Sequence, residues 1–236
     1  MLNLNYSYQT NVEKAYIVTI KGNEKSEKYS LRCQESCKNV GMEYEVWDAF
    51  DGTGEGIKTP ERFKDESIFK ILKVTDHYKT KSEVACTLSH FSLWLECAKI
   101  DKPIVVLEHD AIMVKKFEQF EHFNSIVYLG CIEWAKRGWP IGKIPLHGSD
   151  GNNYHFLLRT HSYAVDPTMA KNLIAHCVKY GITAAPDYLV RADIFNITHQ
   201  GLYAYDDMPD HEQNTTITNR KMFDNSNRKR NDGLIY

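Results

Sequence analysis

The sequence predicts a single α/β domain, residues 1–236, in which helices flank a mostly parallel, Rossmann-like central sheet. Apolar strands alternate along the chain with segments of helical periodicity, which is typical of this fold class. One run, residues 104–107 (IVVL), is apolar throughout, as expected for a strand that is covered on both faces. The length of 236 residues suits one domain.

The first third of the chain reads as a β-α-β unit. A strand is expected at residues 15–20, followed by a helix that Asn23 caps and that ends near residue 40, before Gly41. A second strand is expected at residues 43–49, and the turn-rich run 51–56 follows it. A loop at the end of the second strand of such a unit suits nucleotide binding.

The central stretch, residues 84–114, combines a helix, a break and the buried strand. Ser82 is the expected N-cap of this helix. Glu108 and Asp110 follow the strand directly, where ligands bind in open α/β sheets, and two carboxylates there can hold a divalent cation and a diphosphate. On spacing alone, a solvated turn is an equally good interpretation of this common tripeptide.

The remaining elements are expected in the following order. A helical stretch lies at residues 61–72, and a short helix or loop at 117–123. Strands lie at 125–129 and 154–166, and Pro167 opens a helix that Gly181 ends. The loop 130–153 is long enough to be functional or mobile, and its Trp134 and Trp139 either stack on a sugar or a base, or cap the core. The polar tail from about residue 217 is expected to be flexible.

Composition excludes several classes of protein. The formal net charge of −2 argues against a non-specific nucleic-acid binder. The six cysteines form no CxxC pair, which argues against a zinc site. Neither a signal peptide nor an apolar run of transmembrane length is visible, so we expect a cytoplasmic protein with reduced thiols.

Two segments resemble family 25 glycosyltransferases. Residues 82–90 (SEVACTLSH) and 107–111 (LEHDA) are similar to the family's G-E-x-G-C-x-L-S-H helix and to the strand after it, which ends in E-D-D. The matching helix residues are Glu83, Cys86, Leu88, Ser89 and His90. Ser82 and Ala85 replace glycines, and His109 replaces the middle acid.

Further blocks resemble the family in the same order, from about residue 15 to residue 190. Residues 48–52 (DAFDG) resemble its a-x-D-G element, and the first strand resembles its Y-V-I-N-L-x-R stretch. Thr19 stands at the usual Asn of that stretch, and Ser26 stands where an Arg often follows. Residues 160–173 and 186–189 resemble two later segments.

The resemblance implies a GT-A fold that uses the acidic cluster as its D-x-D motif. It implies metal ligation by Asp110 and Glu108, with Mn²⁺ or Mg²⁺ as the ion, although His109 puts the metal dependence in question. His199 and His211 are late-chain candidates for a third ligand, of which His211 is preferred; each is alternatively a surface histidine. The candidate donor-binding residues are Thr19, Asp48, Asp51, Gly52, Glu83 and Glu108.

An inverting reaction, which the resemblance also implies, needs a base near the acceptor hydroxyl. Asp187 is the first candidate because it opens a helix and matches a family position; it is alternatively a plain helix N-terminal acid. His90 is the second candidate, and it is alternatively a structural histidine bonded to a carboxylate.

The leading hypothesis is a hexosyl- or pentosyltransferase that moves a sugar from a UDP-type nucleotide donor to a hydroxyl of a bacterial surface glycan. A second hypothesis is a phage enzyme that glycosylates hydroxymethylated bases in DNA, which the basic run at residues 228–230 permits. A third is a non-catalytic module that binds nucleotide sugars, motivated by His109 and by the missing Arg near Ser26.

Overall fold

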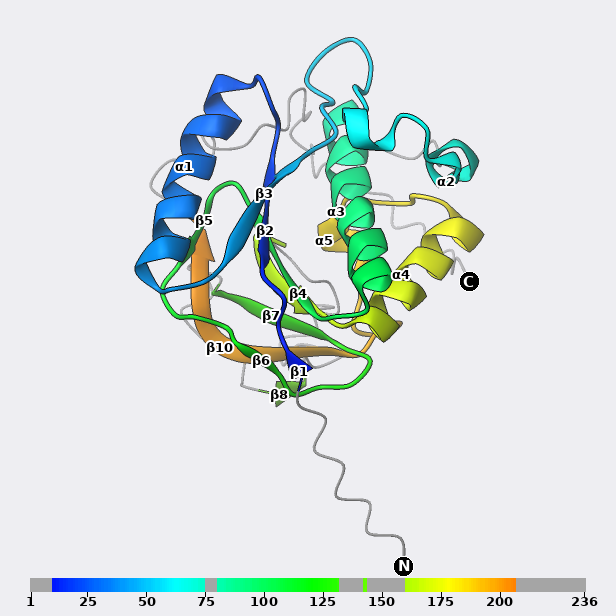
Figure 1. Ribbon diagram of the computed structural model, residues 1–236. Helices are drawn as coiled ribbons and strands as arrows, with labels where there is room; N and C mark the ends of the chain where they lie inside the picture. Colours follow the sequence, from blue (N-terminus) through cyan, green and yellow to red (C-terminus); the bar gives the residue numbers. More distant parts are fainter. Residues whose placement is uncertain (1–9, 75–79, 132–141, 144–159, 207–236) are drawn as a thin grey trace, which may run out of the picture.

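An eight-stranded sheet lies between two layers of helices (Figure 1). The computed structural model describes residues 10–74, 80–131, 142–143 and 160–206. The strands of this sheet are β2 (Ala15–Thr19), β3 (Tyr44–Asp48), β4 (Ile104–Glu108), β5 (Ala111–Met113), β7 (Ile126–Cys131), β8 (Gly142–Lys143), β9 (Ser162–Val165) and β10 (Ile197–Asp206). Their order is β3-β2-β4-β9-β7-β10-β5, and β8 pairs with β10.

The sheet is mixed, with one direction dominant. Strand β2 runs parallel to β3 and β4, and β10 runs parallel to β7. Strand β9 is antiparallel to both of its neighbours, β4 and β7, so these two point the same way. Only β9, β5 and β8 therefore oppose the common direction of the described strands, which confirms the predicted mostly parallel sheet.

Helix α1 (Glu24–Asn39) covers one face of the sheet, and α3 (Lys81–Ile100) and α4 (Pro167–Tyr180) cover the other (Figure 1). The ends of α1 are as predicted, because Asn23 accepts a hydrogen bond from Ser26 N and Gly41 has a φ of 69°. Strand β4 separates two apolar clusters. Its alternate residues Ile104 and Val106 face α3, while Val105 and Leu107 pack in the cluster with α1. The prediction of an interior strand is confirmed.

The predicted N-cap of α3 is wrong. Thr80, not Ser82, caps this helix: Thr80 Oγ1 accepts from Glu83 N, and the Glu83 carboxylate accepts from Thr80 N. Ser82 lies in the first turn and donates its hydroxyl to the carbonyl oxygen of Gly52. A capping box needs an acid three residues after the cap, and only Thr80 has one.

Smaller elements also differ from the expectations. The stretch 61–72 divides into a 3₁₀ turn, η1 (Glu61–Phe63), and a short helix, α2 (Ser67–Ile71). Residues 117–123 contain β6 (Gln119–Phe120), which pairs with β1 (Thr10–Asn11) in a separate two-stranded sheet. Of the strand expected at 154–166, the part before residue 160 lies outside the described residues. Among the helices described, none has the length and apolar character needed to cross a membrane.

Candidate active site

The carboxyl end of β4 and the start of β9 bring the acidic residues of two chain segments together. Glu108 ends β4, and His109 and Asp110 form the turn into β5. Glu108 N donates to the carbonyl oxygen of His161 at 2.9 Å, which continues the β4–β9 pairing to this edge. Thr160 and His161 therefore lie beside the acidic cluster, although about fifty residues separate them from it in the sequence.

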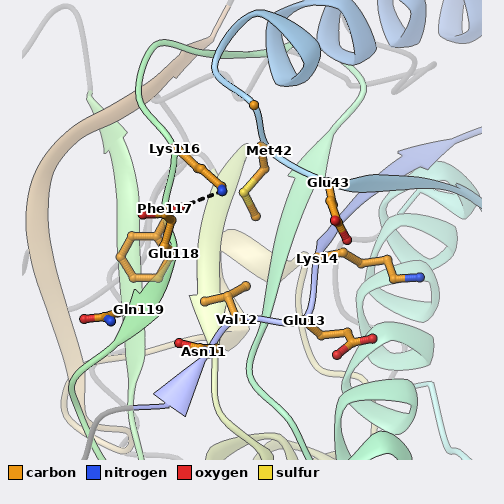
Figure 2. Close-up of a pocket in the computed structure, with 11 residues that line it drawn as sticks. Asn11, Val12, Glu13, Lys14, Met42, Glu43, Lys116, Phe117, Glu118 and Gln119 are labelled. Carbon is orange, nitrogen blue, oxygen red and sulfur yellow. Dashed lines mark ion pairs between the residues drawn. The ribbon is translucent and has the colours of Figure 1, made fainter.

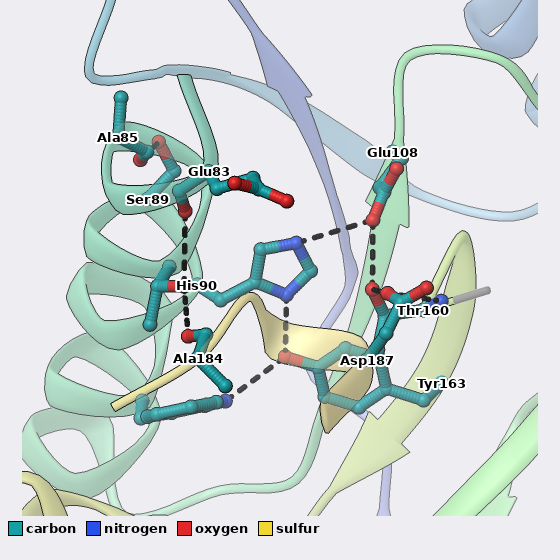
Figure 3. A network of polar contacts seen from close by, with 11 residues as sticks. Glu83, Ala85, Ser89, His90, Glu108, Thr160, Tyr163, Ala184 and Asp187 are labelled. Carbon is teal, nitrogen blue, oxygen red and sulfur yellow. Dashed lines mark hydrogen bonds and ion pairs between the residues drawn. The ribbon is translucent and has the colours of Figure 1, made fainter. Parts of the chain in front are cut away.

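Glu108 is held by two side chains (Figure 3). His90 Nε2 lies 3.5 Å from Glu108 Oε1, and the Thr160 hydroxyl donates to the same oxygen at 2.9 Å. Burial alone would raise the pKa of Glu108, but the contacts with His90 and Thr160 outweigh it and lower this pKa well below its ordinary value. Glu108 is therefore ionised at neutral pH.

His90 is fully buried on α3 and is oriented by Tyr163. Its Nδ1 lies 3.0 Å from the Tyr163 hydroxyl, which accepts a hydrogen bond from Trp94 Nε1 at 2.9 Å. Since an indole only donates, the proton of Tyr163 is available for His90 Nδ1, and a hydrogen on Nε2 of His90 then faces Glu108. This assignment gives a partner to the Trp94 indole, the Tyr163 hydroxyl and His90 Nδ1, while His90 Nε2 lies in contact with Glu108 at 3.5 Å without a hydrogen-bond partner in the described part of the chain.

Asp187 shares the Thr160 hydroxyl with Glu108 (Figure 3). It belongs to α5 (Pro186–Leu189), and its Oδ1 accepts from the Thr160 hydroxyl at 2.8 Å and from Thr160 N at 3.4 Å. A hydroxyl carries one hydrogen, so Thr160 can donate fully to only one of the two carboxylates at a time. The structure thus brings the predicted base and the predicted donor-site acid to one shared hydroxyl.

Asp110 and His161 carry buried polar atoms that have no hydrogen-bond partner within the described part of the chain. These atoms are Asp110 Oδ1 and both ring nitrogens of His161, whose side chain is only 3% exposed. Burial raises the pKa of Asp110; nearby Glu108 adds to this effect, and His109 and His161 oppose it. Buried polar atoms without partners are costly, and a divalent cation would satisfy a carboxylate oxygen and an imidazole nitrogen together. The residues at this edge therefore fit a metal ion.

The other predicted donor residues lie along the carboxyl ends of β2 and β3. Thr19 and Asp48 are paired in the parallel register and line a pocket of about 660 Å³ between α1 and the edge strand β3. The Thr19 hydroxyl donates to Ser30 Oγ at 2.7 Å, so it already has a partner. Asp51 accepts from the backbone and hydroxyl of Thr53, and these bonds lower its pKa although burial opposes them.

Gly52 and Glu83 both contact the first turn of α3. A Cβ atom on Gly52 would lie 2.3 Å from the carbonyl oxygen of Lys81, so only glycine fits against the first turn. The carboxylate of Glu83 is occupied by the capping box at this turn. Both residues hold the helix that carries His90, and their donor-binding roles stay predictions.

Several predicted residues lie elsewhere. Trp134, Trp139 and His211 fall outside the described residues. His199 is not at the surface: it is 5% exposed on β10, and its Nε2 lies 3.0 Å from the carbonyl oxygen of Gly130. A pocket of about 400 Å³ lies at the opposite end of the sheet, lined by residues that include Met42, Glu43 and Lys116, and it contains none of the candidate site residues (Figure 2).

Sequence reasoning missed the roles of Thr160, His161 and Tyr163. All three stand in the segment 160–173, which matched the family pattern, but nothing in the sequence indicated that β9 inserts antiparallel beside β4.

Comparisons with known proteins give one family. The family model described as "Glycosyltransferase family 25 (LPS biosynthesis protein)" matches residues 13–139, which is more than half of the chain. No curated protein matches. Among solved structures, the crystal structure of the galactosyltransferase LgtC with donor and acceptor sugar analogs is similar, with a TM-score of 0.42 and 9% identity over 78% of this chain and 72% of that one.

Proposed function

The chain belongs to glycosyltransferase family 25, and from this premise we propose that it transfers a sugar from a UDP-type nucleotide donor to a hydroxyl of a bacterial surface glycan, with inversion at the anomeric carbon. The observation that carries the proposal is the pair of carboxylates, Glu108 and Asp187, on the single hydroxyl of Thr160. Glycosyl transfer needs one group for the donor and one for the acceptor proton, and the proximity of these two carboxylates supports assigning one role to each.

Asp187 is the proposed base. As the acceptor oxygen forms its bond to the anomeric carbon, its proton passes to the Asp187 carboxylate. The bond between that carbon and the donor phosphate breaks, and the nucleoside diphosphate leaves with the bonding electron pair. Thr160 holds Asp187 in position through its hydroxyl and its backbone N–H.

Glu108 and Asp110 are the proposed ligands of Mn²⁺ or Mg²⁺, with His161 as a further candidate beside His211. The partnerless atoms of Asp110 and His161 support this choice, and Glu108 keeps one oxygen outside its contacts with His90 and Thr160. When bound, such an ion neutralises charge on the leaving diphosphate. The strand-end residues Thr19 and Asp48, at the edge pocket, are proposed to bind the donor nucleoside.

The two other hypotheses are weaker. The comparisons give no support to modified DNA as the acceptor, and we do not propose it. A non-catalytic sugar-binding module has no need of a second carboxylate at the donor site, whereas Thr160 joins Asp187 to Glu108 here.

The proposal is tested with a panel of UDP-sugars. Each sugar is added with and without Mn²⁺, and the melting temperature is measured; the sugars that bind are then assayed for UDP release with and without glycan acceptors. A donor that stabilises the protein and is consumed faster with a glycan present supports the transferase. Donor binding without turnover across acceptors would favour the binding module instead.

A further inference from the structure

Cys86 and His90 lie one helical turn apart on α3, on the side that faces Glu108 of β4. Residues four positions apart share a face of a helix, so both side chains point the same way. Their ligand atoms and a carboxylate oxygen of Glu108 all lie within 4.8 Å of one another. We propose that Cys86, His90 and Glu108 form a binding site for a thiophilic divalent cation such as Zn²⁺. This site differs from the Mn²⁺ or Mg²⁺ site proposed at Asp110, although the two share Glu108.

The spacing of these atoms is close to that of a tetrahedral zinc site. Zinc binds nitrogen and oxygen at about 2.0–2.2 Å, which places two such ligands about 3.3 Å apart around a tetrahedron. His90 Nε2 and Glu108 Oε1 are already 3.5 Å apart. Cys86 Sγ lies within 4.8 Å of both atoms, so it needs to approach by at most about 1 Å, a movement that a change in its χ1 angle can supply.

The position of His90 suits a metal ligand. It is fully buried, and its Nε2 has no hydrogen-bond partner among the residues that the structure describes. Its Nδ1 is fixed by the Tyr163 hydroxyl at 3.0 Å, and histidine ligands of metals are commonly oriented by such a bond at their second nitrogen. On binding, the ring hydrogen moves to Nδ1, where the oxygen of Tyr163 can accept it.

The charge around Cys86 favours a cation. Burial raises the pKa of the thiol, and four carboxylates add to this effect: Glu108, Asp187, Asp110 and Glu83. The thiol therefore keeps its proton until a cation binds, and it then releases that proton to solvent. The Cys-x₃-His spacing on one helix explains why a search for CxxC pairs misses the site.

A cation held by the thiol would regulate the transferase, a consequence that rests on the proposed function. Glu108 belongs to both sites, so zinc bound through Cys86 and His90 engages an acid that the donor site needs. Zinc should therefore inhibit a reaction supported by Mn²⁺. Sulfur and nitrogen ligands select zinc over Mg²⁺ and Mn²⁺, which prefer oxygen.

The experiment uses Co²⁺ as a spectroscopic probe of the full chain. A thiolate ligand gives cobalt a charge-transfer absorption in the near ultraviolet, and we expect this band at one equivalent in the wild type, with Zn²⁺ displacing it. Cys86→Ser should lose the band. Cys177→Ser, which changes a buried thiol in α4, should keep it. Tyr163→Phe should weaken cobalt binding about 10–100-fold, as removal of the group that orients a ligand does.

Absence of the band in the wild type, or its persistence in folded Cys86→Ser, would overturn the site. Circular dichroism of each variant verifies folding. The inhibition is tested separately: zinc should slow the wild type and Cys177→Ser but spare whatever turnover Cys86→Ser retains. Inhibition that is equal in all three proteins would overturn the regulatory role. The cobalt titration needs no turnover, so failure of the proposed function would not affect its result.

Discussion

Glu108 and Asp187 share one hydroxyl group: Thr160 Oγ1 lies 2.9 Å from Glu108 Oε1 and 2.8 Å from Asp187 Oδ1. The two acids come from β4 and α5, which are far apart in the sequence. If Asp187 is the base, Asp187→Asn should keep donor affinity but lose on the order of 10²–10⁴-fold in turnover, measured as kcat for transfer.

The matched control is Asp193→Asn, which changes an exposed acid that pairs with Arg191 just after α5. It should leave turnover unchanged. Asp187→Asn with near-normal kcat and a lower melting temperature would make Asp187 a structural acid. Loss of donor affinity in the same variant would place Asp187 in the donor pocket instead.

Thr160 gives a second prediction about the same relationship. Thr160→Val removes the hydroxyl and leaves two carboxylates without its hydrogen bond, which should cost about 1–3 kcal/mol of stability and lower kcat. Thr160→Ser keeps the hydroxyl and should recover most of both. The stability of the two variants is measured by chemical denaturation, and their kcat by transfer kinetics. Equal stability and equal kcat in Thr160→Val and Thr160→Ser would mean that the hydroxyl is dispensable.

The parts of this site that follow from local sequence were predictable. The strand 104–107 and the caps of α1 depend on neighbouring residues, and both predictions were confirmed. The roles of the acids at the end of this strand stay predictions. The cap of α3 was also readable, because Thr80 has Glu83 three residues later whereas Ser82 has Ala85. A reciprocal pair of hydrogen bonds therefore selects Thr80 as the cap, where a lone hydroxyl at Ser82 does not suffice.

The meeting of Thr160 with Glu108 and Asp187 was not predictable from local pattern. It depends on β9 entering the sheet between β4 and β7 against the common direction. Hydrophobic periodicity identifies a strand but not its neighbours. The position of His161, whose ring nitrogens have no partner in the described part of the chain, follows from the same tertiary pairing. Cys86 and His90 share a face of α3 through local spacing, but their proximity to Glu108 depends on how α3 packs on β4.

The ionised state of Glu108 gives a pH prediction. Its pKa in the folded protein is lower than its ordinary value of 4.5, so the charged form stabilises the fold above pH 4.5, and this stabilisation is lost as the pH falls toward the folded pKa. Glu108→Gln should therefore lower the melting temperature most at pH 7, and the gap from the wild type should narrow below pH 4.5. Glu61→Gln, at an exposed surface pair, should change little at any pH. A difference in melting temperature between the wild type and Glu108→Gln that stays constant with pH would contradict the lowered pKa of Glu108.

Gly52 gives a prediction that needs no substrate. In Gly52→Ala the new Cβ would lie 2.3 Å from Lys81 O and 2.7 Å from the Cα of Ser82, and both are backbone atoms at the start of α3. The first turn must move, which should cost about 1–3 kcal/mol in denaturant unfolding. Gly54→Ala is the control, since no heavy atom lies within 4 Å of its Cβ. Equal stability of the two variants would show that α3 adjusts freely.

Asp110 provides the test of the proposed ion. Its Oδ1 is buried without a hydrogen-bond partner in the described part of the chain, and burial raises its pKa. In the absence of metal, Asp110→Asn should therefore be tolerated, with an unchanged or slightly higher melting temperature, because it removes a carboxyl group whose charged form is disfavoured there. With Mn²⁺ and a UDP-sugar present, the wild type should gain stability through ligand binding and the variant should not. Calorimetry of Mn²⁺ binding, with and without the donor, measures the same difference directly. Unchanged Mn²⁺ and donor affinity in Asp110→Asn would remove this residue from the donor site and leave His161 and Glu108 as the groups to vary next.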